Sequence, residues 1–103
     1  MPTRLQLRTD RRDDGEPVLV AAGELDLSNV HLFAAAIQEA APAGNGDVLH
    51  VDLSAIEYLD SGTINVLFEH AGSIDLVVNP LLLPVLTISG LTDVVTVKPA
   101  PAI

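Results

Sequence analysis

Cysteine and tryptophan are both missing from this chain of 103 residues, and its aromatic side chains are limited to Phe33, Tyr58 and Phe68. Without cysteine there can be no disulfide framework, thiolate metal site or cysteine nucleophile. Three scattered aromatic residues do not make a stacking platform for single-stranded nucleic acid. The stability of the chain must therefore come from an apolar core.

Positive charge is missing from the body of the chain, because no Lys or Arg lies between Asp13 and Val97. Fourteen acidic residues face five basic ones, which gives a formal net charge of -9. Such a body repels phosphate backbones, so nucleic acid and anionic lipid are poor partners. A basic protein surface is a better match. The open alternative is that the acids only keep a small apolar domain in solution.

Long apolar runs are missing as well. The stretch 76–88 comes nearest to one, but it is broken by Asn79, Pro80, Pro84 and Thr87, so no transmembrane helix is expected. The first residues, Met1 to Arg4, lack the apolar segment of a signal peptide. We therefore expect a cytoplasmic protein without direct membrane contact.

Apolar residues are nevertheless abundant, at 49% of the chain, while charged residues make up 18%. This balance is typical of one globular domain, which we place at residues 1–98 with a loose tail at 99–103. Alternating or continuous apolar residues predict strands at 5–9, 17–24, 48–53, 74–78 and 94–97. A polar hairpin connection at 10–16 joins the first two strands.

Three helices are expected between these strands. Apolar positions such as Phe33 and Ile37 mark one helix after the capping segment 26–29, and it stops within 42–47. Ile64, Leu67 and Phe68 mark a second helix, which ends at Gly72. A third runs from Pro80 to about Ser89, and Pro84 either kinks it or marks its true start. The order predicts an α/β domain with a five-stranded, mainly parallel sheet and an antiparallel hairpin at its start.

A catalytic constellation is not evident. His31, His50 and His70 are scattered, and the chain has no Gly-x-Ser-x-Gly elbow, so a hydrolase would have to assemble Asp60, Ser61 and a distant histidine. Neither a calcium loop nor a phosphate loop is present. We therefore expect no enzyme activity, catalytic residue, metal or cofactor, with a hydrolase that uses Ser61 as the weakest alternative.

One segment does carry a chemical feature, at Asp60-Ser61, where a helix opens. An aspartate followed by a helix is typical of an N-cap. A serine hydroxyl at that position is exposed, and a phosphate placed on it would meet free backbone N–H groups and the positive end of the helix dipole.

The sequence resembles the STAS domains, and more narrowly the bacterial anti-sigma factor antagonists, over nearly its whole length. The resemblance rests on Gly23-Glu24-Leu25-Asp26 after one strand, and on Asp52-Leu53-Ser54 leading to Leu59-Asp60-Ser61 after the next. Asn79-Pro80 and Ser89-Gly90-Leu91 near the end also match.

The resemblance implies partner switching. In this family an anti-sigma factor that is itself a serine kinase phosphorylates the serine after the aspartate, here Ser61, with ATP and Mg²⁺ belonging to the kinase. The unmodified antagonist binds the anti-sigma factor and frees the sigma factor, and a phosphatase restores the modified form. The implied contact residues are Asp26, Asp60, Ser61, Gly62 and Thr63, and Thr63 is a weaker second acceptor. The oligomeric state is left open between monomer and weak dimer.

The chain departs from the family pattern directly after Ser61. Gly62-Thr63-Ile64-Asn65 replaces the usual small residue followed by Gly-Leu-Gly, and the expected helix is a turn or more shorter than usual before Gly72. An alternative function is therefore kept. Small isolated STAS domains also serve as accessory subunits that bind the ATPase of an ABC lipid transporter.

Overall fold

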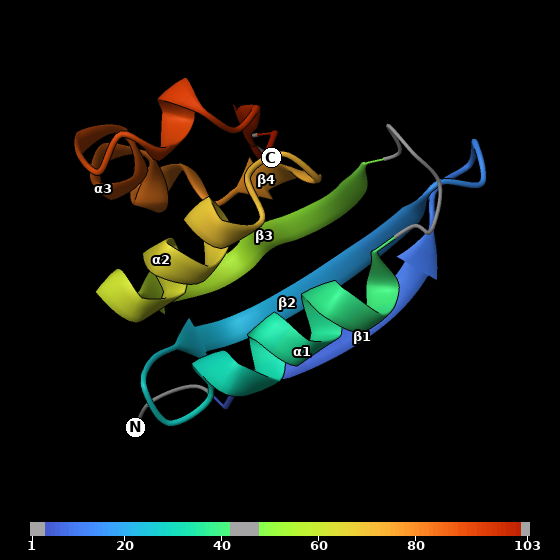
Figure 1. The fold of residues 1–103 in the computed structure, drawn as a ribbon, viewed down its shortest axis with the longest axis horizontal. Helices are drawn as coiled ribbons and strands as arrows, with labels where there is room; N and C mark the ends of the chain where they lie inside the picture. The colour runs from blue at the N-terminus through green and yellow to red at the C-terminus, as the bar shows by residue number, and fades with distance from the viewer. Residues whose placement is uncertain (1–3, 42–47, 102–103) are drawn as a thin grey trace.

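The computed structural model describes residues 4–41 and 48–101, and Figure 1 shows their arrangement. In chain order the elements are β1 (Gln6–Arg11), β2 (Pro17–Leu25), α1 (Val30–Ala40), β3 (Leu49–Leu59), α2 (Ser61–Glu69), β4 (Ile74–Val78), the 3-10 turn η1 (Pro80–Leu82), α3 (Leu83–Ile88), the 3-10 turn η2 (Leu91–Asp93) and β5 (Val97–Pro99). The expected stop of the first helix at 42–47 lies outside the described residues.

One five-stranded sheet organises the domain, with the order β1-β2-β3-β4-β5. β1 pairs with β2 in the antiparallel sense, and all later pairs are parallel. Parallel crossovers that step along a sheet in one direction place their helices on one face, because the crossovers are right-handed. Figure 1 shows α1 and α2 side by side on that face. The predicted fold class is confirmed.

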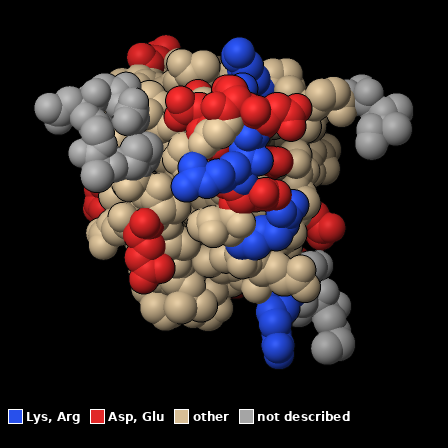
Figure 2. Space-filling view, turned by 90° about the vertical axis from the view of Figure 1, so that its right-hand side faces the viewer, with Lys and Arg blue, Asp and Glu red and all other residues tan. Residues whose placement is uncertain are grey.

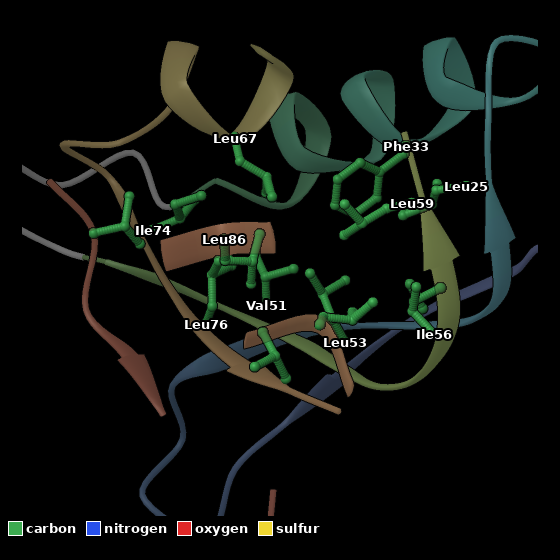
Figure 3. Packing of buried hydrophobic residues seen from close by; sticks show 14 of the residues in the cluster. Leu25, Phe33, Val51, Leu53, Ile56, Leu59, Leu67, Ile74, Leu76 and Leu86 are labelled. Atoms are coloured by element: carbon green, nitrogen blue, oxygen red, sulfur yellow. The ribbon is translucent and has the colours of Figure 1, made fainter. Parts of the chain in front are cut away.

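The core lies between this helical layer and the sheet. Phe33 of α1, Leu67 of α2 and Leu86 of α3 are fully buried, and Figure 3 shows them directed toward buried leucine and valine side chains of β3 and β4. On β4, residues alternate between buried and half-buried. No helix of the described residues covers the second face of the sheet, and half-buried polar residues such as Asp52 and Asp75 occupy it.

The predicted end of the third strand at residue 53 is wrong, because β3 continues to Leu59. Its pairing with β2 shifts register twice, between Val20 and Ala22 and between Gly23 and Glu24. Extra residues on β3 shift its buried positions to Leu53, Ile56 and Leu59. Spacing by three is not the alternation expected of a strand, so the sequence pattern concealed this half of β3.

The last strand was also misplaced, because β5 covers Val97–Pro99 instead of 94–97. A 3-10 turn precedes it, and the N–H groups of Val94 and Val95 both donate to the carbonyl of Leu91. The sequence alternation there reflects an exposed Val94 beside a buried Val95 in a turn. Pro84 lies in the first turn of α3, so the second of the two readings of that proline is confirmed.

The expected domain limit at residue 98 stays a prediction. Pro99 pairs with Val78, and the N–H of Ala100 donates to the Val78 carbonyl at 2.8 Å. The sheet therefore holds the chain at least to this point.

Candidate functional site

Two loops meet at the carboxyl edge of the sheet, where β2 and β3 end together. Leu25 and Leu59, the last residues of these parallel neighbours, are paired. The loop 26–29 therefore begins beside Asp60, and the Leu27 side chain reaches α2. A Cβ atom on Gly62 would lie 3.6 Å from Leu27 Cδ2. The loop 26–29, together with Asp60 and the first turn of α2, is called the switch edge.

Asp60 is the N-cap of α2, as predicted. Its Oδ1 accepts hydrogen bonds from the backbone N–H of Thr63 at 3.0 Å and from the Thr63 hydroxyl at 3.2 Å. Ser61 is the first helical residue and is exposed, whereas Thr63 is completely buried. The cap thus fixes the backbone on both sides of Ser61, while Ser61 itself stays exposed.

The burial of Thr63 separates it from the other predicted contact residues. Asp26, Asp60, Ser61 and Gly62 all retain exposed surface at the switch edge. Thr63 has no exposed surface, and its hydroxyl is already engaged with Asp60. In this conformation the buried Thr63 stabilises the cap through its two hydrogen bonds to Asp60.

The loop that carries Asp26 is held by its own side chains. Asp26 Oδ1 accepts hydrogen bonds from the hydroxyl and the N–H of Ser28. These two bonds, the hydroxyl bond first, lower the pKa of the Asp26 carboxyl. Asn29 joins both ends of the loop, because it accepts from the Asp26 N–H at 3.0 Å and donates to the Glu24 carbonyl at 2.9 Å.

The structure adds residues to the switch edge that the sequence analysis had missed. Leu27 is 80% exposed and Leu32, in the first turn of α1, is 52% exposed. Exposed leucines beside a polar site offer apolar surface that the core of a protein interface could cover. The sequence signal that could have revealed Leu27 as a surface residue is its place inside the capping segment 26–29. No position of the expected core required a leucine there.

Arg4 is the second addition. A shallow hollow of about 440 Å³ beside Asp26 is lined by Arg4, Leu5, Glu24, Asp26, Ser28, Asn29 and Leu32. The antiparallel pairing of β1 with β2 brings this arginine to the acidic loop, although it is far from the loop in sequence. A cation is thus present near the switch edge, although the stretch 13–97, which contains Asp26 and Asp60, has no Lys or Arg.

The remaining candidates for chemistry lie elsewhere in the described part of the chain. His50 Nδ1 is 2.7 Å from Asp75 Oδ1, and its Nε2 is 2.9 Å from an Arg12 nitrogen. These side chains occupy the uncovered face of the sheet. Within residues 4–41 and 48–101 there is no group of three His, Asp or Glu that could hold a metal, and no helix long and apolar enough to cross a membrane.

Comparison with known proteins matches this architecture to one family. The family model described as "Mlab, STAS domain" matches residues 9–96. Since the match covers most of the chain, the protein belongs to the STAS domain family. None of the curated protein sequences matches it.

Solved structures share the fold at low sequence identity. An anti-sigma factor antagonist from Mycobacterium paratuberculosis superposes with a TM-score of 0.83 at 21% identity, covering 97% of this chain and 90% of that one. The unphosphorylated anti-sigma factor antagonist SpoIIAA gives 0.70 at 20% identity, with 93% and 89% covered. Phosphorylated Bacillus SpoIIAA, a cell fate determinant, gives 0.57 at 22% identity, with 93% and 92% covered.

Proposed function

We propose that this protein is an anti-sigma factor antagonist whose binding to an anti-sigma factor kinase is switched off by phosphorylation of Ser61. The observation that carries the proposal is the exposed Ser61 at the start of α2, where the Asp60 cap fixes the backbone beside the exposed Leu27. Solved structures with the same fold include antagonists in unphosphorylated and phosphorylated form. The protein would bind and regulate without catalysis of its own.

The unmodified switch edge suits a protein partner. Leu27 and Leu32 would be covered by apolar side chains of the anti-sigma factor, while Asp26 and Asp60 would face basic residues on its rim. The braced loop 26–29 and the capped helix hold these groups in place before binding, which reduces the entropy lost on association.

Phosphorylation would break this contact through charge and bulk. A phosphate adds about -1.5 to -2 charges at neutral pH, next to Asp60 and on a chain whose net charge is already -9. The backbone N–H groups at the start of α2 can donate hydrogen bonds to the phosphate, so the domain itself need not refold. The partner surface would instead face an unpaired anion in a contact that excludes water.

The decisive test uses the purified protein with the anti-sigma factor kinase from its own genome, ATP and Mg²⁺. We expect one phosphate in the intact mass, its loss in Ser61→Ala, and its retention in Ser28→Ala, the matched control on the neighbouring loop. Thr63→Val should also be phosphorylated, because the buried hydroxyl is not the acceptor. An unchanged mass with every such kinase would overturn the switch.

Binding provides a second readout. We expect Ser61→Asp to weaken capture of the anti-sigma factor, and Leu27→Ser to weaken it without affecting the fold. If Leu27→Ser binds as tightly as the native chain, the contact lies elsewhere.

The second candidate function, an accessory subunit bound to the ATPase of an ABC lipid transporter, is favoured by an exposed apolar stripe. Leu81, Val85 and Ile88 are 76%, 39% and 87% exposed, and their spacing places them on one side of η1 and α3. A constitutive subunit could use such a stripe without any phosphoryl switch. Affinity capture would distinguish the two, because an ATPase retained by the native chain and lost with Ile88→Ser favours this candidate.

A further inference from the structure

The outer edge of the sheet at β1 lacks a neighbouring strand among the described residues. β1 is the terminal strand of the sheet, and five of its six residues are exposed. Figure 2 shows basic side chains gathered along one side of the molecule and interleaved with acidic ones. Exposed edge strands present backbone N–H and C=O groups that can pair with another strand.

The hairpin determines which backbone groups point outward. The N–H of Arg12 donates to the carbonyl of Glu16 at 2.9 Å, so this residue pair is of the hydrogen-bonded kind. Such pairs alternate along an antiparallel ladder, so Arg8 and Asp10 also bond toward β2, whereas Leu7, Thr9 and Arg11 direct their N–H and C=O groups outward. Pro17 opposite Arg11 agrees, because proline has no N–H to give to β1.

The side chains of β1 alternate in the same way. Leu7 packs against the core on the helical face, so Thr9 and Arg11 share that face. Arg8 and Asp10 share the uncovered face, where Arg8 Nη1 bonds Asp10 Oδ2 at 2.9 Å. The edge therefore carries one base and one acid on the same face, two residues apart.

This pattern is complementary to itself when the pairing is centred on Thr9. A second copy that pairs antiparallel through the outward groups can be centred on Arg8, Thr9 or Asp10. Centring on Arg8 places two arginines opposite each other, and centring on Asp10 places two aspartates opposite each other, both of which are unfavourable. Centring on Thr9 places Arg8 of each copy opposite Asp10 of the other.

We propose that two copies of this chain associate through β1 in the register centred on Thr9, which joins their sheets into one continuous sheet. Thr9 then exchanges backbone hydrogen bonds with Thr9 of the second copy, and Leu7 pairs with Arg11. Arg11 N–H is now accepted by Asp10 Oδ1 at 2.8 Å. On pairing, this N–H donates to the strand of the second copy instead. The Asp10 carboxylate is then free to bind Arg8 of the second copy.

The charge distribution favours this edge over the rest of the surface. Four of the five basic residues, Arg4, Arg8, Arg11 and Arg12, lie on or next to β1. Most of the other charged residues are acidic, so two copies that met through them would repel each other.

A groove between β1 and α1 gives the second copy an apolar surface to cover. It has a volume of about 810 Å³, and Leu7, Ala36 and Ala40 line its apolar side, with Arg11 and Glu39 also in the lining. The side chains that a second β1 directs to the helical face would lie at the mouth of this groove.

Analytical ultracentrifugation of the purified full chain over a range of concentrations tests the proposal. We expect a reversible monomer–dimer equilibrium in the native protein and a monomer in Thr9→Pro. That proline removes an outward N–H and leaves the β1–β2 bonds intact, so circular dichroism should show a folded domain. Thr9→Val, which keeps the N–H, is the matched control and should still dimerise.

Charge exchange tests the register. Arg8→Asp and Asp10→Arg should each raise the dimer dissociation constant about tenfold or more, because like charges then face each other. The double variant Arg8→Asp/Asp10→Arg should restore the dissociation constant of the native dimer, because opposite charges face each other again. A native chain that stays monomeric, or a dimer indifferent to Thr9→Pro and to both single exchanges, overturns the proposal. Ser61→Ala should dimerise normally, so the result is independent of the phosphorylation test.

Discussion

At the scale of single residues, Asp60 both begins a helix and presents a serine. Its Oδ1 accepts from the N–H and the hydroxyl of Thr63, and the first turn of α2 owes its fixed position to these bonds. The proposed phosphoacceptor Ser61 therefore directly follows an N-cap that the domain needs for its stability in any case.

Asp60→Ala should lower the free energy of unfolding by about 0.5–2 kcal/mol, because α2 loses its N-cap. Urea denaturation followed by circular dichroism measures this change. Asp60→Asn, which keeps a cap oxygen, should retain most of the stability, and an equal loss in both variants would assign the effect to the negative charge instead.

Ser28→Ala should raise the pKa of the Asp26 carboxyl toward its ordinary value, because the Ser28 hydroxyl is the first cause of its lowering. A carboxyl with a lowered pKa stabilises the folded loop at pH values above the pKa of the unfolded chain, about 3.9. This contribution disappears as the pH falls through the pKa of the folded protein. NMR titration of the Asp26 carboxyl checks the direction. An identical titration curve in Ser28→Ala would contradict the assigned cause.

At the scale of elements, one glycine lies at the start of a helix and another follows the end of a helix, and their backbone conformations differ. Gly62 lies inside the first turn of α2 with ordinary helical φ, whereas Gly90 follows α3 with φ of 87°. Only the second conformation is one that glycine adopts more readily than other residues.

Alanine should therefore have opposite effects at these two positions. Gly62→Ala should stabilise the domain by about 0.5–1 kcal/mol through helix propensity, because its new Cβ would be 3.4 Å from Asp60 Oδ1 and 3.6 Å from Leu27 Cδ2, within ordinary contact range. Gly90→Ala should destabilise it by about 1–2 kcal/mol, since the left-handed conformation is strained for alanine. Thermal unfolding of both variants measures the signs, and a destabilised Gly62→Ala would mean that the added methyl disturbs the Asp60 cap.

At the scale of the whole molecule, the three helices and the sheet share one hydrophobic cluster. Phe33, Leu67 and Leu86 come from different helices and meet the buried face of β3 and β4 (Figure 3). The domain should therefore unfold as a single unit, with the helices dependent on the sheet.

Phe33→Ala should cost about 3–5 kcal/mol of stability, because it leaves a cavity in the middle of this cluster. Unfolding monitored by far-ultraviolet circular dichroism and by amide exchange should shift together. A loss confined to the amides of α1 would show that the helix unfolds separately.

The sequence by itself determined the alternation of strands and helices, the antiparallel start and the cap at Asp60-Ser61. These features depend on short-range patterns: apolar periodicity, glycine and proline at element ends, and an acceptor side chain before a helix. The family resemblance also came from local motifs, at Gly23–Asp26 and at Leu59–Ser61, which each lie at the end of a strand.

The tertiary structure decided what no local pattern encodes. The second half of β3 is a strand because it pairs with β2 across two register shifts, and its own residues show no alternation. Thr63 is buried and Leu27 exposed because two loops far apart in sequence meet at one sheet edge. Arg4 reaches the Asp26 hollow through antiparallel pairing. In each case long-range contacts, which depend on the position of another strand, determine the environment of the residue.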